Sequence, residues 1–246
     1  MNLPPLRMPG ATLVTRLKVY DTPGPDGQPG GTPHFHLACT EMYFTLGGSG
    51  GVEIIDNNGF KFVELPVHTA FLFSAGTLHR LINRGGLEIL IVMQNSGLPE
   101  RGDTVVTVTK AVLADELRYY KAVCAGSLEE AYLRRDAGVA GFLEIKNAFA
   151  RSPDEGRAAL NELYKQAQRL TRPKHAEWYE TVAKGAFSEA QDSLKQIVDL
   201  TAGKTGYLKE ARNFFVPAAP HATIGYCGTL NRYFDPVTLL PEGVKA

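Results

Sequence analysis

The chain has little cysteine, no excess of either charge and no long apolar run. Its three cysteines, Cys39, Cys124 and Cys227, are scattered and form no CxxC pair. This excludes a disulfide framework and fits reduced thiols in a cytosolic protein. Lysine plus arginine equals aspartate plus glutamate, at 26 each, so the charge favours neither nucleic acid nor an anionic membrane as a partner. No apolar run approaches the roughly 18 residues that a membrane span needs.

Several common motifs are also missing. There is no GxSxG nucleophile elbow, no phosphate-binding loop, and no GxGxxG after a predicted strand. No basic recognition helix is visible, which argues against a DNA-binding regulator. Residues 1–19 lack a basic stretch followed by an apolar one, so no signal peptide is predicted and a cytoplasmic location is expected.

The first half of the chain consists of short runs that are typical of strands. Residues 11–20 alternate between apolar and polar side chains. Asn57-Asn58-Gly59 is a hairpin-turn signal, and the glycine-rich run 47–51 is also interpreted as a hairpin turn. Many short strands at this spacing predict a sandwich or barrel. The remaining strand-like runs are 42–46, 51–56, 61–65, 70–73, 79–83, 88–94 and 104–110.

Helical signals dominate from about residue 112 onward. Ser127 with Glu130 forms a capping box, and Ser152-Pro153 starts a helix with a cap and a proline in its first turn. Two apolar stripes have helical spacing, Leu160/Leu163/Ala167/Leu170 and Ala190/Leu194/Ile197/Val198. We therefore predict an α+β protein of 246 residues, with a β-barrel domain over 1–111 and a helical C-terminal region with an irregular tail over 112–246. The stripes are expected to pack against the barrel or a second subunit.

Four side chains in the strand-rich half have the character of metal ligands. His34 and His36 are one residue apart on an extended segment, so their imidazoles point to the same side. Glu41 follows closely, and His79 comes from a later segment. Three imidazole nitrogens and one carboxylate oxygen suit a divalent transition metal.

The order of these residues resembles the two motifs of the cupin family. The first motif, HxH, a short gap, Glu, six residues and Gly, is matched by His34, His36, Glu41 and Gly48. The second reads Ser74-Ala75-Gly76-Thr77-Leu78-His79-Arg80-Leu81-Ile82-Asn83. Ser74 replaces the usual proline, and His68 occupies a position where glycine is common. The resemblance covers about residues 11–110 and implies a jelly-roll barrel whose metal is iron, manganese, nickel, copper or zinc.

The resemblance leaves the reaction open. We expect a metal-dependent enzyme acting on a small molecule, most plausibly by an oxygenase-type reaction. The alternatives are a non-redox isomerase or lyase and a non-catalytic small-molecule-binding protein. Tyr43 shares the parity of Glu41 and is a candidate donor to a ligand oxygen, although it also fits as a barrel-filling aromatic. A homodimer is expected, and nucleic acid or membrane partners are not.

Four further residues have side chains of a type found in such sites. Cys39 is predicted to pack beside the ligand loop. Arg101 is predicted to lie in a solvated loop, and the alternative is that it binds an anionic substrate. His221 follows a proline in the apolar tail and is a weaker candidate for approaching the site. His175 is placed on a helix surface.

Overall fold

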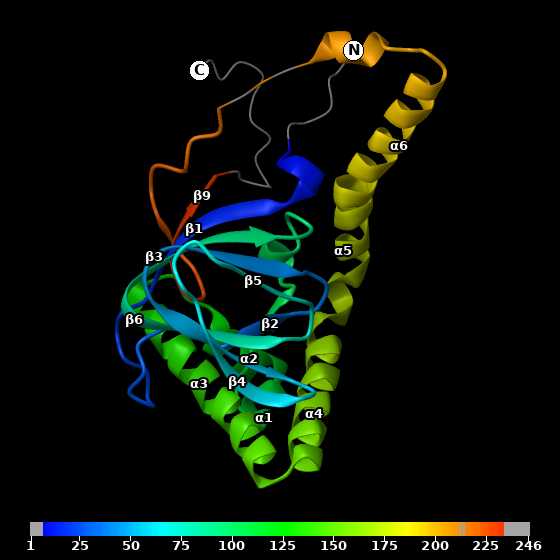
Figure 1. The fold of residues 1–246 in the computed structure, drawn as a ribbon. Coiled ribbons are helices and arrows are strands. Elements are labelled where there is room, and N and C mark those ends of the chain that lie inside the picture. The colour runs from blue at the N-terminus through cyan, green and yellow to red at the C-terminus, as the bar shows by residue number, and fades with distance from the viewer. Residues whose placement is uncertain (1–6, 212, 214, 234–246) are drawn as a thin grey trace.

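The computed structural model describes residues 7–211, 213 and 215–233. Its described strands form one antiparallel sheet, which is covered on one side by helices (Figure 1). The strands are β1 (Leu13–Val19), β2 (His34–His36), β3 (Glu41–Asp56), β4 (Gly59–Glu64), β5 (Ala70–Phe73), β6 (Leu78–Met93), β7 (Thr104–Val106), β8 (Thr223–Ile224) and β9 (Gly228–Arg232).

The sheet is built around the two longest strands, β3 and β6. The order of neighbours is β4-β3-β6-β1-β9-β8, while β5 pairs with β3 and β2 lies between β6 and β7. All pairings are antiparallel, as expected for strands joined by short turns. The α+β class and the strand-rich first half predicted from the sequence are confirmed, although the described strands leave the sheet open rather than closed into a barrel.

One sequence prediction about β3 is wrong. The run Gly47 to Gly51 is not a hairpin turn but lies inside β3, which continues from Glu41 to Asp56. The pairing of β3 with β6 shifts its register three times between Thr45 and Gly50, so the glycines form bulges that bend one long strand. Likewise, the predicted strands 79–83 and 88–94 are parts of the single strand β6.

The helical region follows the strands as predicted. Its helices are α1 (Lys110–Leu113), α2 (Glu116–Val123), α3 (Leu128–Arg151), α4 (Pro153–Thr171), α5 (His175–Val182) and α6 (Ser188–Thr201). Short 3-10 segments occur at η1 (Pro9–Ala11), η2 (Pro99–Arg101), η3 (Arg172–Lys174) and η5 (Gly206–Glu210), and a π-helical turn, η4 (Ala183–Phe187), joins α5 to α6. None of the described helices is both long and apolar enough to cross a membrane.

Both predicted helix starts are confirmed. The Ser127 hydroxyl accepts a hydrogen bond from the Glu130 backbone N–H at 3.2 Å, and the Glu130 carboxylate accepts one from the Ser127 N–H at 3.1 Å. The Ser152 hydroxyl accepts from the N–H of Glu155 at 3.1 Å. These caps satisfy amide groups that a helix leaves unpaired at its start.

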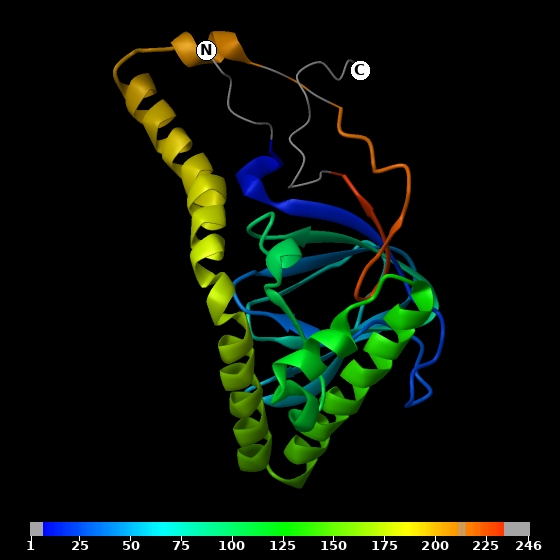
Figure 2. The ribbon, with the colours of Figure 1, turned by 180° about the vertical axis from the view of Figure 1, so that it is seen from behind.

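Helices α3 and α4 bury their apolar faces against the sheet (Figure 2). The stripe Leu160, Leu163, Ala167 and Leu170 is buried in one cluster with Phe35 of β2. That cluster also contains residues of β3, β6 and β7, so the helices complete the core from which the ligand strands extend.

The second predicted stripe is exposed in this chain. Leu194, Ile197 and Val198 of α6 are 64%, 58% and 67% exposed. Figures 1 and 2 show α4, α5 and α6 following one another along one side of the molecule, with α6 extending past the sheet. This stripe does not pack on the barrel in the single chain. The other predicted alternative, packing on a second subunit, remains a prediction that sedimentation would test.

The C-terminal tail corrects another expectation. Instead of being irregular throughout, it returns to the sheet as the hairpin β8–β9, with Leu230 of β9 opposite Leu17 of β1. Gly225 donates its N–H to the carbonyl of Gly228 at 2.8 Å, which closes the tight turn. This hairpin places Tyr226 and Cys227 over the ligand group predicted from the sequence.

Candidate metal centre

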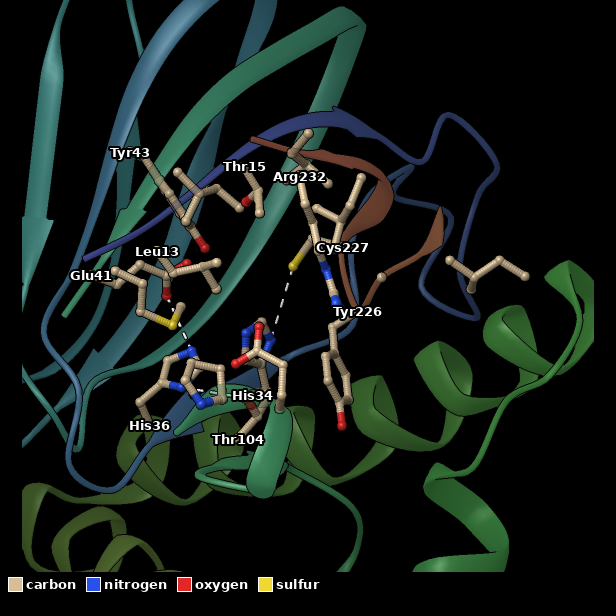
Figure 3. Close-up of a pocket in the computed structure, with 18 of the residues that line it drawn as sticks. Leu13, Thr15, His34, His36, Glu41, Tyr43, Thr104, Tyr226, Cys227 and Arg232 are labelled. Atoms are coloured by element: carbon tan, nitrogen blue, oxygen red, sulfur yellow. Dashed lines mark hydrogen bonds and ion pairs between the residues drawn. The ribbon is translucent and has the colours of Figure 1, made fainter. Parts of the chain in front are cut away.

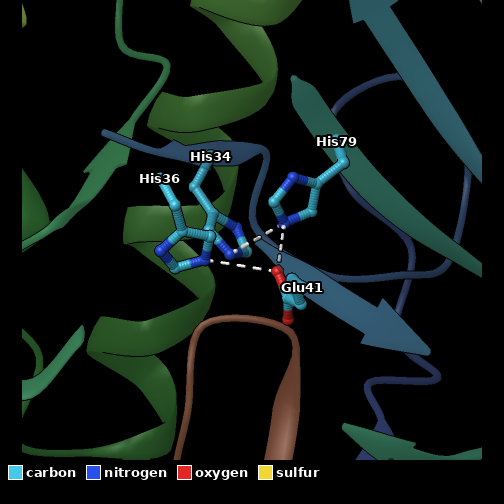
Figure 4. A group of neighbouring side chains, drawn as sticks. All are labelled: His34, His36, Glu41 and His79. Carbon is cyan, nitrogen blue, oxygen red and sulfur yellow. Dashed lines mark hydrogen bonds and ion pairs between the residues drawn. The ribbon is translucent and has the colours of Figure 1, made fainter. Parts of the chain in front are cut away.

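Three strands bring the four predicted ligands together (Figure 4). His34 and His36 lie on β2, Glu41 begins β3, and His79 lies on β6 directly opposite His34. All four side chains are buried. Gly76 precedes His79 in a left-handed conformation, φ 86°, and its N–H donates to the carbonyl of His36 at 2.8 Å. A turn of this kind suits glycine and ties the second motif to the first.

The potential ligand atoms of these side chains all lie within 4.8 Å of one another. The Nε2 atoms of His34 and His79 are 3.1 Å apart. The Glu41 Oε2 atom is 3.3 Å from Nε2 of His36 and 3.4 Å from Nε2 of His79. The sequence thus predicts the grouping correctly.

The other ring nitrogen of each histidine has a fixed partner. Nδ1 of His34 lies 2.8 Å from the carbonyl oxygen of Thr32, and Nδ1 of His79 lies 3.0 Å from that of Thr77. A carbonyl oxygen only accepts, so both Nδ1 atoms carry the proton and both Nε2 atoms carry a lone pair. Nδ1 of His36 lies 3.0 Å from Oδ2 of Asp103.

Asp103 is fully buried and holds the loop that joins the ligands. Its Oδ1 atom accepts hydrogen bonds from the backbone N–H groups of Leu37 and Ala38 at 3.0 and 2.7 Å. Its Oδ2 atom faces His36. A carboxylate in this place orients the imidazole and increases its basicity as a ligand.

The arrangement fits a cation. The Nε2 atoms of His34 and His79 lie 3.1 Å apart, and each carries a lone pair, so they repel each other and do not form a hydrogen bond. Nε2 of His36 and Oε2 of Glu41 are buried and have no hydrogen-bond partner among the described residues. Buried polar atoms without partners are costly, and a divalent ion held by these four atoms removes both the repulsion and that cost.

The histidines differ in their affinity for protons. Burial lowers the pKa of His34 to about 3 and that of His79 well below its ordinary value. Burial also acts to lower the pKa of His36, but the hydrogen bond to Asp103 and the negative charges of Asp103 and Glu41 outweigh it and raise that pKa to about 9. In the absence of metal, the His36 ring therefore carries a proton on both nitrogens at neutral pH, whereas the rings of His34 and His79 are neutral.

A cavity of about 260 Å³ lies beside this group (Figure 3). Side chains of β1, β6 and β9 form an apolar wall that includes Leu13, Met93 and Leu230. Tyr43 lines it as predicted, and burial together with the charge of Glu41 raises the pKa of its phenol well above the ordinary value. The phenol therefore keeps its proton at neutral pH.

The sequence missed the residues that close the cavity from the helical region and the tail. Arg134 of α3 and the hairpin residues Tyr226 and Cys227 line it, as does Glu100 of η2. The Tyr226 ring stacks on the His34 ring, with centroids 5.4 Å apart. These contacts join segments far apart in the chain, and no local pattern predicts those of Arg134, Tyr226 and Cys227. Glu100 and Asp103 lie in the same loop as Arg101.

The weaker sequence candidates lie outside the ligand group. Cys39 is buried but is not one of the converging ligands. Arg101 pairs with Glu177 of α5 at 2.8 Å instead of lining the cavity. His175 and His221 are exposed, and so is His68, whose φ of 65° explains why glycine is common at its position.

Neither a family model nor a curated protein matches the chain. Solved structures with partial similarity include a variant of Streptomyces Pac13 with uridine, at 14% identity, 34% of this chain, 58% of that chain and a TM-score of 0.27. They also include WlaRA, a TDP-fucose-3,4-ketoisomerase from Campylobacter jejuni, at 16% identity over 32% of this chain and 58% of that chain, with a TM-score of 0.28. A cupin protein from Bacteroides fragilis has 17% identity over 35% of this chain and 65% of that chain, with a TM-score of 0.26. The chain thus spans little more than half of the first two. The candidate site rests on the chain's own residues, which the structure brings together.

Proposed function

We propose that His34, His36, Glu41 and His79 bind one divalent transition metal and that the chain is a metal-dependent enzyme acting on a small molecule. The observation that supports this most is the convergence of three imidazole Nε2 atoms and one carboxylate oxygen in a buried group that the protein itself leaves unsatisfied. Four protein ligands leave open positions on a metal that takes more than four.

The cavity supports a small-molecule substrate. It borders His34, His36 and Glu41, so a molecule inside it lies next to the proposed ligands. The mostly apolar wall holds a carbon skeleton, and Tyr43 supplies a phenol O–H to a substrate oxygen. When bound, the metal supplies a Lewis acid or redox centre.

Two reaction classes fit this site. We put an oxygenase-type reaction first because a nitrogen and oxygen ligand set with open positions and no thiolate is typical of non-haem iron oxygenases. A non-redox isomerase or lyase also fits, with Glu100 at the cavity as a candidate acid or base. The third candidate function is a protein that binds a small molecule without catalysing a reaction.

Metal analysis of protein purified without chelators tests the proposal. Near-stoichiometric metal is expected in the wild type, and H36A is expected to lose most of it while keeping its fold by circular dichroism. H221A, which removes an exposed histidine, is the matched control. Iron, manganese or copper supports the oxygenase, and zinc or nickel supports the non-redox classes. A wild type without metal, or an H36A variant with full occupancy, contradicts the metal site.

A further inference from the structure

A buried arginine from the helical region faces the same cavity as the metal site. Arg134 of α3 is only 5% exposed and lines the cavity together with His34, His36 and Glu41. The strand-rich half of the chain supplies the proposed ligands, so this residue adds a different chemistry from a different element.

Arg134 differs from the other buried arginines of the described chain. Arg80 pairs with Asp26 at 2.5 Å, and Arg135 pairs with Asp136 at 2.9 Å. Arg134 makes no ion pair with any carboxylate of the described residues, and its Nε atom, like that of Arg80, has no hydrogen-bond partner there. Because buried charges in proteins are normally paired, this guanidinium lacks an anion.

The guanidinium is nevertheless held in one place. It lies over the Tyr226 ring, 4.4 Å from the centroid, and its Nη2 atom donates to the carbonyl of Gly225 at 2.5 Å. The Tyr226 ring also stacks on the ring of His34. The fixed positive charge and a proposed metal ligand therefore contact the same aromatic ring.

Close packing of α3 brings Arg134 to the cavity. Gly138 and Gly141 follow Arg134 by one and two turns, on the same side of the helix. A Cβ atom at Gly141 would collide with the carbonyl oxygens of Thr107 and Val108, and one at Gly138 would lie 3.1 Å from Val106 Cγ1. Only a helix with glycine at these positions approaches β7 this closely.

Resting on the proposed function, we propose that Arg134 binds the carboxylate of a small organic-acid substrate and holds it in the cavity beside the metal. The guanidinium presents several N–H donors in a plane, which matches a carboxylate. A volume of about 260 Å³ limits the rest of the molecule to a small skeleton against the apolar wall. Glu100 and Arg232 also line the cavity. Glu100 makes no ion pair with Arg134, so its carboxylate does not take the place of the substrate.

Charge selectivity tests this role directly. Benzoate and its neutral analogue benzamide are titrated calorimetrically into wild type, R134M and R84Q, each in chelator-treated and metal-loaded form. R84Q removes an exposed arginine that pairs with Glu64 and is the charge control. Wild type and R84Q are expected to bind benzoate about tenfold or more tightly than benzamide, as expected for hydrogen bonds to a charged group.

R134M is expected to lose this preference while its affinity for benzamide stays within about twofold, because a methionine keeps the apolar stem. A role that only holds the β8–β9 hairpin predicts equal loss for both probes. If R134M does not fold, R134K serves instead and is expected to show a reduced preference. Three results would overturn the proposal. Wild type binds the two probes equally, wild type does not bind benzoate, or a folded R134 variant keeps the wild-type preference for benzoate.

The two proposals fail in different ways. Absence of metal in purified protein contradicts the proposed function, but the comparison of wild type with R134M in chelator-treated protein remains readable. Conversely, if the protein binds metal but R134M prefers benzoate over benzamide as strongly as wild type does, the metal site is supported and the role of Arg134 in binding a carboxylate is contradicted.

Discussion

At the scale of single residues, Asp103 determines which nitrogen of His36 is available to a metal. Its carboxylate accepts from Nδ1 of His36, which leaves a lone pair on Nε2. In D103N, the amide oxygen continues to accept from the Leu37 and Ala38 N–H groups. The amide NH2 then faces Nδ1 and favours the tautomer with the proton on Nε2, the atom needed as a ligand.

We therefore expect D103N to bind metal about 10- to 100-fold more weakly than wild type, as measured by competition with a chromophoric chelator. The control is D154N, which neutralises an aspartate on the exposed surface of α4. Unchanged affinity in a folded D103N variant would show that Asp103 does not control the tautomer of His36.

The pKa of His36 leads to a second prediction at this scale. Because that pKa is raised from its ordinary value of 6.5 to about 9, the His36 ring of the metal-free protein carries a second proton, on Nε2, at pH 7.5. Binding displaces this proton, whereas the lowered pKa values of His34 and His79 leave those rings neutral. We expect release of about one proton per metal, with affinity rising about tenfold per pH unit up to about pH 9.

Calorimetric titrations in buffers of different ionisation enthalpy measure that proton release. D103N provides the internal control, since loss of the negative charge beside His36 lowers its pKa and reduces the number of protons released near pH 8. Metal binding by wild type without proton release at pH 7.5 would contradict the raised pKa.

How far the sequence predicts the site depends on how local each contact is. His34 and His36 lie on one strand, whose alternation fixes their common direction, and Glu41 follows them closely at the start of the next strand. His79 joins them through a second recognisable motif. Arg134 and Tyr226 reach the site only through packing of α3 and the tail hairpin on the sheet, and neither residue type nor spacing indicates that contact.

At the scale of elements, the packing of α3 against the segment that follows β7 leaves no space for a side chain at Gly141. We expect G141A to reduce the free energy of unfolding by about 1–3 kcal/mol, because its methyl group has no space against the Thr107 and Val108 carbonyls. The control, G206A, adds a methyl group where nothing lies within 4 Å and is expected to change it by less than about 0.5 kcal/mol.

Chemical denaturation of the two variants gives both values. A G141A protein as stable as wild type would mean that α3 moves away from β7 at little cost. In that event the close approach would not be what fixes Arg134 at the cavity.

Elements were predictable where a local signal decided their ends. Ser127 and Ser152 cap helices α3 and α4 because cap and first turn are adjacent in sequence. The glycines within β3 carry the same local signal as a turn, and only the pairing partner β6 makes them bulges. The β8–β9 hairpin is short and depends on β1 for its pairing, so the tail sequence alone does not reveal it.

At the scale of the whole molecule, one apolar cluster joins the two predicted regions. Phe35 of β2, Leu78 of β6 and Val106 of β7 share it with Phe142 of α3 and Leu160 of α4. His34 and His36 flank Phe35, and His79 follows Leu78. The helices thus support the strands that carry the proposed ligands. The boundary near residue 111 remains a proposal, and this cluster implies that unfolding the helices also disrupts the site.

The last prediction separates a cooperative molecule from two independent domains. L160A removes a fully buried side chain from the shared cluster and is expected to lower the free energy of unfolding by about 2–5 kcal/mol. L194A makes the same change on α6, where the side chain is 64% exposed, and is expected to cost less than about 0.5 kcal/mol in the monomer. If the cluster couples the regions, L160A lowers the denaturation midpoints of helical circular dichroism and of metal release together. If the helices unfold in L160A while the metal stays bound, the strand-rich region is stable without them, and the coupling inferred from the shared cluster is wrong.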